Sequence, residues 1–166
     1  WEQAEKHMQQ LALDILAEKA GMKKKDFGLV LSGDLLNQCI GSSFTLRNTG
    51  IPHIGLYGAC STMAESLSLA AMTIDGGFAK LTAAVTSSHF CSAERQFRFP
   101  LEYGGQRTPT AQWTVTGAGC IVVSKTAHQS APAIEKITIG KICDLGITDA
   151  NNMGAAMAPV DVKLTP

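Results

Sequence analysis

The hydrophobic pattern is clearest between Ile51 and Gly77, where it predicts a strand, a tight turn and a helix. Pro52 can begin a strand but cannot lie in its middle, and a mainly apolar run then continues until Gly58 interrupts it. After the turn, apolar residues recur at the spacing of a helix, at Met63, Leu67, Ala70, Ala71 and Ile74. Apolar residues also occupy the other faces, so we expect a helix that is buried nearly all round.

The same reading predicts an amphipathic helix at Trp1–Ala20 that packs on a core, with Gly21 as its stop. Its expected buried stripe consists of Ala4, Met8, Leu11, Ile15 and Leu16. Ser42 or Ser43 is expected to cap a short helix that runs through Arg47. Further strands are predicted at Phe27–Leu31, Ala79–Ser87, Thr114–Lys125 and Ile134–Ile142.

Alternation of strands and helices along the first half of the chain favours an α/β fold, with a mostly parallel sheet and helices on its faces. Ligands of such sheets bind at the carboxyl ends of the strands, which is where Cys60 lies. The polar stretch Glu94–Pro109 contains Pro100 and two consecutive glycines, so we expect an ordered loop there rather than a helix.

The amino-acid composition limits which classes of protein this chain can belong to. The chain has 166 residues, of which 45% are hydrophobic and 17% charged, as in a globular domain with a real core. Lys+Arg and Asp+Glu are equal at 14 each, so nothing favours electrostatic capture of nucleic acid. No apolar run reaches the ~20 residues that span a bilayer. The chain does not begin with Met and shows no signal peptide, so we expect a fragment.

The five cysteines do not resemble a disulfide framework, because their number is odd and they lie far apart, which fits a reducing compartment. His89 and Cys91 could both ligate a metal, but a pair two residues apart is a weak signal, and we expect no metal site.

Cys60 is the first candidate for chemistry. Ser61 and Thr62 are good N-cap residues, so the thiol is expected beside unpaired N–H groups and the positive end of a helix dipole. Both favour the thiolate, and the same N–H groups could hold an oxyanion or a carboxylate. The alternative is that Cys60 is only a small packed residue in a tight turn.

Gly58-Ala59-Cys60-Ser61, followed by a helix of small residues, resembles the nucleophile turn of the thiolase and ketoacyl synthase superfamily. The runs from Ser87 to Ser124 and from Asp144 to Pro159 closely resemble the stage V sporulation protein AD family. The resemblance covers essentially the whole chain. It implies a layered αβα thiolase-like fold with a mixed sheet, of which residues 1–166 form the N-terminal half without its opening strand.

The resemblance also implies a function. Members of the sporulation family bind dipicolinic acid and take part in its uptake, with calcium, into the developing spore, beside membrane proteins of the same system. The implied protein is an intracellular, non-catalytic homodimer at the membrane of that spore, without a cofactor. In the thiolase-like fold, the strand corresponding to Ala79–Ser87 is expected to pair across the dimer axis.

Six residues are the predicted ligand contacts: Cys60, Ser61, His89, Arg95, Gly117 and Gly119. In the superfamily a glycine-rich kink such as Gly117–Gly119 brings the backbone close to the nucleophile turn. His89 is either a polar loop residue or an imidazole at the mouth of the pocket. The arginines and aromatic residues from 94 to 109 could form a dimer interface or bind a planar dicarboxylate. In the second case we expect one arginine, Arg95, to face the pocket.

Two other functions stay open. An acyl-transfer enzyme would carry its acyl group on Cys60 as a thioester, but it needs a base, and the superfamily supplies its histidine from the second half. His128 lies in an unpromising predicted loop, Ala127–Pro132. The third possibility is a structural module that only dimerises, with Cys60 in a packing role.

Overall fold

The structure is a computed structural model that describes residues 2–97, 109, 114–126 and 130–148, with the backbone alone for 95–97. Four strands form one mixed sheet in the order β2-β1-β3-β4. They are β1 (Leu29–Gly33), β2 (His53–Leu56), β3 (Leu81–Ser88) and β4 (Gly117–Ser124). β1 runs parallel to both β2 and β3, whereas β4 is antiparallel to β3.

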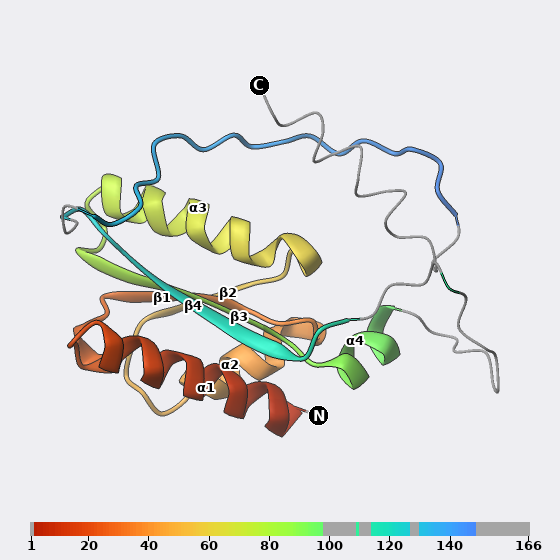
Figure 1. Cartoon of the computed structure of the whole chain (residues 1–166), viewed down its shortest axis with the longest axis horizontal. Coiled ribbons are helices and arrows are strands. Elements are labelled where there is room, and N and C mark those ends of the chain that lie inside the picture. Colours follow the sequence, from red (N-terminus) through yellow and green to blue (C-terminus); the bar gives the residue numbers. More distant parts are fainter. Residues whose placement is uncertain (1, 98–108, 110–113, 127–129, 149–166) are drawn as a thin grey trace.

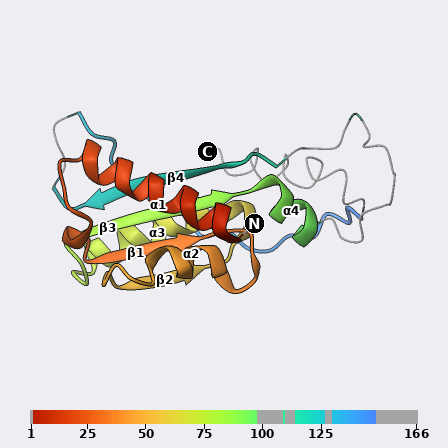
Figure 2. The same ribbon diagram turned by 90° about the horizontal axis from the view of Figure 1, so that it is seen from below.

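Helices cover both faces of this sheet. α3 (Thr62–Asp75) lies on one face, and α1 (Glu2–Lys19) and α2 (Ile40–Leu46) lie on the other (Figure 1). Figure 2 shows α1 and α2 together against the sheet, with α4 (Phe90–Phe97) beyond the end of β3. The short 3₁₀ turns are η1 (Lys24–Asp26), η2 (Asn37–Cys39) and η3 (Ala59–Ser61). The layered α/β architecture is therefore confirmed.

Two apolar clusters fill the two interfaces between sheet and helices. The cluster under α1 and α2 includes Leu13, Val30, Leu46, Ala83 and Val85. The cluster under α3 joins Leu31, Leu56 and Ala70. Alternate residues of β1 thus serve opposite clusters, as the two-residue period of a strand requires.

The predicted buried stripe of α1 is wrong in part, because Leu16 packs against the core as expected but none of the five predicted residues is fully buried. The residues that it buries are Glu5, Gln9, Leu13 and Ala17, while Leu11 and Ile15 are 52% and 41% exposed. Burial of the two polar side chains is possible because they find hydrogen-bond partners at the ends of β1 and β3. Gly21, with φ of +63°, ends this helix region as predicted.

α3 buries one face rather than its whole circumference. Its buried residues are Thr62, Ser66, Ala70 and Ile74. Ala64 is exposed and Met72 is 41% exposed, so the expectation of burial nearly all round is wrong among the described residues. A spacing of four residues brings small side chains toward the sheet, which lets the helix approach it closely.

Four further predictions differ from the structure. α2 begins at Ile40, after a left-handed Cys39, rather than at Ser42 or Ser43. Residues 134–142 form no strand, because no neighbouring strand pairs with them. The stretch expected to be a loop from Glu94 begins inside α4, and its residues 98–108 lie outside the described ones. β3 pairs on both sides, with β1 and β4, so it cannot pair across a dimer axis.

Within the described part of the chain, no helix combines the length and the apolar content that a membrane span requires.

Candidate functional site: the Cys60 turn

Cys60 lies in η3, between the carboxyl end of β2 and the first residue of α3, and it is exposed. Ala59 has φ of +50°, a left-handed conformation that is uncommon for a residue with a side chain. The turn is closed locally: Ser61 Oγ donates to the Gly58 carbonyl at 2.7 Å, and the Gly58 N–H donates to Thr62 Oγ1 at 3.1 Å. These bonds hold the thiol at the surface, where small molecules can reach it.

Ser61 occupies the N-cap position of α3, as predicted, but its side chain does not cap the helix. Its hydroxyl is directed back to Gly58 and makes no hydrogen bond to an N–H of the first helical turn. In a 14-residue helix the first N–H groups lack partners within the helix and carry partial positive charge. The Thr62 N–H donates to the Ala59 carbonyl, so an anion beside Cys60 would meet the remaining N–H groups of the first turn without displacing Ser61.

Gly33, the last residue of β1, lies directly behind this turn. A Cβ built on Gly33 would lie 2.3 Å from the Leu56 carbonyl oxygen and 2.4 Å from Thr62 Cγ2. Real Cβ contacts are never so short, so only glycine allows β1, β2 and the start of α3 to meet. The position of the Cys60 turn thus depends on the close packing of β1 against β2 and α3 at Gly33, which the sequence did not predict.

A carboxylate lies on the other side of the turn. Glu65, in the first turn of α3, has an Oε2 atom that is buried and accepts no hydrogen bond from the described residues. A Cβ on Gly58 would come within 2.6 Å of that oxygen, so the carboxyl group packs against the turn itself. A buried carboxylate oxygen without a donor is costly unless a proton or a cation accompanies it.

Gly119 reaches this turn from the opposite edge of the sheet. It pairs with Thr86 on β3, and a Cβ placed on it would lie 3.3 Å from Met63 Cε at the start of α3. The structure thus brings Gly119 close to the helix that follows Cys60. Gly117 pairs with Ser88, and a Cβ there would meet nothing within 4 Å.

His89 is half-buried at the end of β3, next to Gly117 rather than to Cys60. Two bonds join its turn to the residues just before β4: Ser88 Oγ donates to the Val115 carbonyl, and the Phe90 N–H donates to Thr116 Oγ1 at 2.9 Å. His89 Nδ1 is buried and has no hydrogen-bond partner among the described residues. Arg95 lies on α4, and its side chain is outside the described ones.

The predicted ligand residues therefore fall into two groups at one end of the sheet. Cys60, Ser61 and Gly119 surround the start of α3, whereas His89 and Gly117 lie where β3 meets β4. β2 and β3 both end on the side where α3 begins (Figure 1). The grouping follows from the parallel arrangement of β2, β1 and β3, which brings their carboxyl ends to the same edge.

The thiols of the described residues differ in burial and therefore in reactivity. Burial raises the pKa of Cys120 to about 12, and it also raises the pKa of Cys39, whose Sγ donates to the Leu56 carbonyl at 3.0 Å. The exposed thiols of the described part are Cys60, Cys91 and Cys143. Reagents for thiolates are therefore expected to act on these three and not on Cys39 or Cys120.

A hollow of about 300 Å³ lies elsewhere, between the second half of α3 and residues 134–137. Ala71, Met72 and Asp75 line it from the helix, and none of the six predicted ligand residues does. Among the described residues, no group of three or more His, Cys, Asp or Glu side chains is arranged to hold a metal ion.

A second feature escaped sequence reasoning altogether, a set of buried polar side chains where α1 meets the ends of β1 and β3. Its members are Glu5, Gln9, Asp34, Ser42 and Ser87, which we call the Glu5 cluster. Gln9 Nε2 lies 3.1 Å from the Gly33 carbonyl oxygen, 3.0 Å from Ser42 Oγ and 2.9 Å from Ser87 Oγ. The only signal in the sequence is that Glu5 and Gln9 are four residues apart.

Comparison with known proteins gives both a family and a fold. The model of the family described as "Stage V sporulation protein AD (SpoVAD)" matches residues 1–165. The stage V sporulation protein AD of Bacillus subtilis (strain 168) is 47% identical over 159 residues. That match covers 96% of this chain and 46% of the relative, so the chain spans about half the length of that protein.

Solved structures with the same fold are condensing and acyl-transfer enzymes. The 3-oxoacyl-[acyl-carrier-protein] synthase III of Aquifex aeolicus VF5 has a TM-score of 0.56 at 17% identity, over 74% of this chain and 39% of that one. AbyA1, a tetronic acid condensing enzyme, has a TM-score of 0.57 at 17% identity, over 77% and 40%. ChlB3, an acyltransferase, has a TM-score of 0.56 at 18% identity, over 95% and 55%. At these identities the likeness shows the fold alone.

Proposed function

Because this chain belongs to the stage V sporulation protein AD family, we propose that it is a non-catalytic sporulation protein that binds dipicolinic acid for uptake into the developing spore. The ligand is taken up alone or as its calcium complex. The chain spans 46% of its curated relative, so this function belongs to a protein of which these residues are a part.

The observation that carries the proposal is the exposed turn at the start of α3. Dipicolinate is a planar aromatic dianion, and its carboxylates need donors that are not already occupied. The Thr62 N–H already donates to the Ala59 carbonyl, so such donors are the remaining N–H groups of the first turn of α3, which the Ser61 side chain does not cap. Gly119 lets β4 come close to Met63 at the start of the same helix, since it has no side chain of its own.

Glu65 favours the calcium complex over the free dianion. Its unpartnered, buried Oε2 lies against Gly58, close to the turn that would receive the ligand carboxylates. A bare dianion would be repelled there, whereas a calcium ion prefers oxygen ligands and would attract both partners. We therefore expect calcium to strengthen binding.

Acyl transfer by Cys60 is the second candidate, because the fold is shared with condensing enzymes and the thiol is exposed. In that reaction the Cys60 sulfur attacks an acyl thioester, the bond to the leaving thiol breaks, and a base takes the Cys60 proton. The superfamily supplies its histidine from the second half of the fold. We rank this candidate lower because the family to which the chain belongs is described as a sporulation protein.

A homodimer and contacts with membrane proteins of the same uptake system complete the proposal, as does a peripheral location inside the cell at the membrane of the developing spore. A dimer that extends the sheet would have to use an edge strand. In the described sheet those edges are β2 and β4, because β1 and β3 are paired on both sides.

Titration calorimetry of the protein at its full natural length tests the function. We expect dipicolinate to bind, calcium to strengthen the binding and chelation of calcium to weaken it. Benzene-1,3-dicarboxylate has the same two carboxylates without the ring nitrogen, so it should bind more weakly. Equal heats for the two acids, or no heat for either, would contradict dipicolinate recognition.

Thiol labelling locates the ligand. Bound dipicolinate should slow the reaction of Cys60 with iodoacetamide and leave that of Cys143, an exposed thiol far along the chain, unchanged. Cys60→Ala should weaken binding, while the matched variant Cys143→Ala should not. Turnover of an acyl thioester by the wild type, lost in Cys60→Ala, would instead support the second candidate.

A further inference from the structure

Two carboxyl groups share the Glu5 cluster, and both are shielded from water. Glu5 is fully buried on α1, and Asp34 is 1% exposed just after β1. Gly41 of α2 separates them: a Cβ there would lie 2.9 Å from Glu5 Cβ and 3.1 Å from Asp34 Oδ2. Two negative charges in one buried space disfavour each other, because little water is present to screen them.

The hydrogen-bond donors are distributed unequally between the two carboxyl groups. Asp34 accepts bonds from the Leu36 N–H at 2.9 Å, the Ser42 N–H at 2.7 Å and Ser42 Oγ at 2.6 Å. Glu5 Oε2 accepts a bond from Ser87 Oγ, and the backbone of His89 also bonds to the Glu5 carboxyl group, while no donor of the described residues reaches Glu5 Oε1. Donors favour the charged form, so the negative charge belongs on Asp34 and the proton on Glu5.

The groups that face Glu5 from each packed element support this assignment. The end of β1 contributes Asp34, the end of β3 contributes His89, and α2 contributes the Ser42 hydroxyl and backbone. Burial is the largest cause of the raised pKa of Glu5, and Asp34 raises it further. Ser87 and the charge and backbone of His89 lower it by less, so the net direction is upward.

We propose that Glu5 is held as a neutral carboxylic acid and acts as a positioning residue for the Ser87–His89 turn, so that loss of its proton weakens ligand binding at the Cys60 end of the sheet. This inference rests on the proposed function. When the proton leaves Glu5 for solvent, the new charge faces Asp34. The end of α1 then separates from the ends of β1 and β3, and with them from His89.

The sign of the effect on stability follows from the raised pKa. At pH values below 4.5, the ordinary pKa of glutamate, the protonated form of Glu5 contributes its full stabilisation to the fold. That contribution is lost as the pH rises through the raised pKa of Glu5 in the folded protein. Glu5→Gln keeps the shape and cannot ionise. The matched control is Glu18→Gln, which makes the same change on an exposed position of the same helix.

Urea denaturation at a series of pH values, on the protein at full natural length and without ligand, tests the proton. We expect the unfolding midpoint of Glu5→Gln to rise relative to wild type as the pH increases, and Glu18→Gln to follow the wild type. Parallel curves for Glu5→Gln and wild type would overturn the inference. If Glu5→Gln does not fold, infrared spectroscopy of the wild type tests the protonation of Glu5 instead. The carbonyl band of a protonated carboxylic acid should persist above pH 4.5. Loss of that band below pH 4.5 would overturn the inference.

Dipicolinate titrations at low and high pH test the link to binding. We expect the affinity of the wild type to fall more steeply with pH than that of Glu5→Gln, because only the wild type has an ionisable side chain at position 5. Equal slopes would overturn the positioning role. Absence of binding at any pH would overturn the proposed function and the link with it, whereas the difference in urea midpoints would still show the Glu5 proton.

Discussion

The Cys60 turn and the Glu5 cluster lie at the same end of the sheet, but they are built in opposite ways. The turn is exposed and closed by bonds between residues three or four apart, such as Ser61 to Gly58 and Gly58 to Thr62. The cluster is buried and joined by bonds that span 8 to 82 residues. The turn is therefore free to meet a ligand, whereas the cluster fixes the elements that hold the turn in place.

The largest expected effect comes from Gly33, where the two regions meet: its backbone carbonyl accepts a bond from Gln9 and its Cα faces Thr62. Gly33→Ala places a methyl group against backbone that cannot move aside, and we expect a loss of roughly 3 kcal/mol or failure to fold. Gly28→Ala is the matched control, because its Cβ would make ordinary contacts at 3.5 Å. Chemical denaturation measures both, and equal losses would contradict the packing described for Gly33.

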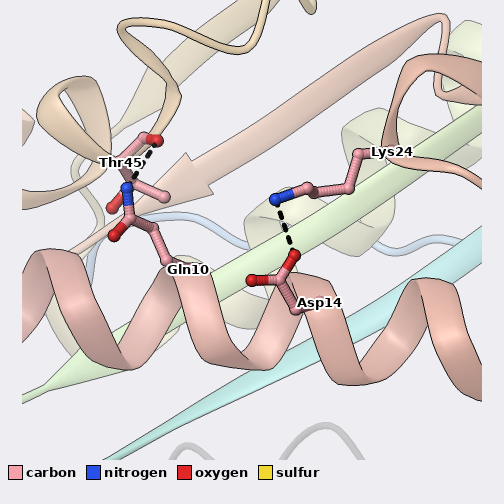
Figure 3. A network of polar contacts seen from close by, with 4 residues as sticks. All are labelled: Gln10, Asp14, Lys24 and Thr45. Carbon is pink, nitrogen blue, oxygen red and sulfur yellow. Dashed lines mark hydrogen bonds and ion pairs between the residues drawn. The ribbon is translucent and has the colours of Figure 1, made fainter.

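The next effect is expected at Gln9. Gln9→Leu keeps the size of the side chain but removes the amide donor shared by Gly33, Ser42 and Ser87. Buried acceptors left without a donor should cost roughly 2 kcal/mol of unfolding free energy. Gln10 makes only a 3.5 Å contact with the Thr45 carbonyl, so Gln10→Leu should cost under about 1 kcal/mol (Figure 3). Equal costs would mean that the buried amide does not hold the cluster together.

The smallest effect is expected on the outer side of the same helix. Asp14 and Lys24 form an ion pair at 2.6 Å, with side chains 52% and 43% exposed (Figure 3). Exposed pairs contribute at most about 1 kcal/mol and weaken with salt. Asp14→Asn should therefore lower stability by less than about 1 kcal/mol at low salt and by still less at high salt. A loss as large as that of Gln9→Leu would contradict the distinction between buried and exposed contacts.

Much of the fold could be predicted from local pattern. The strand, turn and helix around Cys60 lie where the spacing of Ile54, Leu56 and Met63 places them. β4 falls within its predicted range, and β3 is shifted slightly, from Ala79–Ser87 to Leu81–Ser88. The resemblance to the sporulation family supplied the layered architecture, which the comparisons confirm. α3 illustrates why: it carries its own apolar period and is followed directly by Gly76.

The inner face of α1 could not be predicted, because its partners lie far along the chain. Glu5 and Gln9 read as solvent-facing residues until the ends of β1 and β3 provide their hydrogen bonds. The predicted strand 134–142 failed for the complementary reason: its alternation is real, but a strand forms only against a neighbour. Contacts with residues far along the chain determine both the inner face of α1 and the absence of a strand at 134–142. Such contacts leave no local pattern in the sequence.

The central claim is that the turn before α3 binds dipicolinate, and a crystal structure of the full-length protein with dipicolinate and calcium tests it most directly. The account predicts ligand carboxylates within hydrogen-bond distance of the first N–H groups of α3, with calcium beside Glu65. Dipicolinate in the hollow between Met72 and Ile134, or a turn that stays empty at saturating ligand, would contradict it.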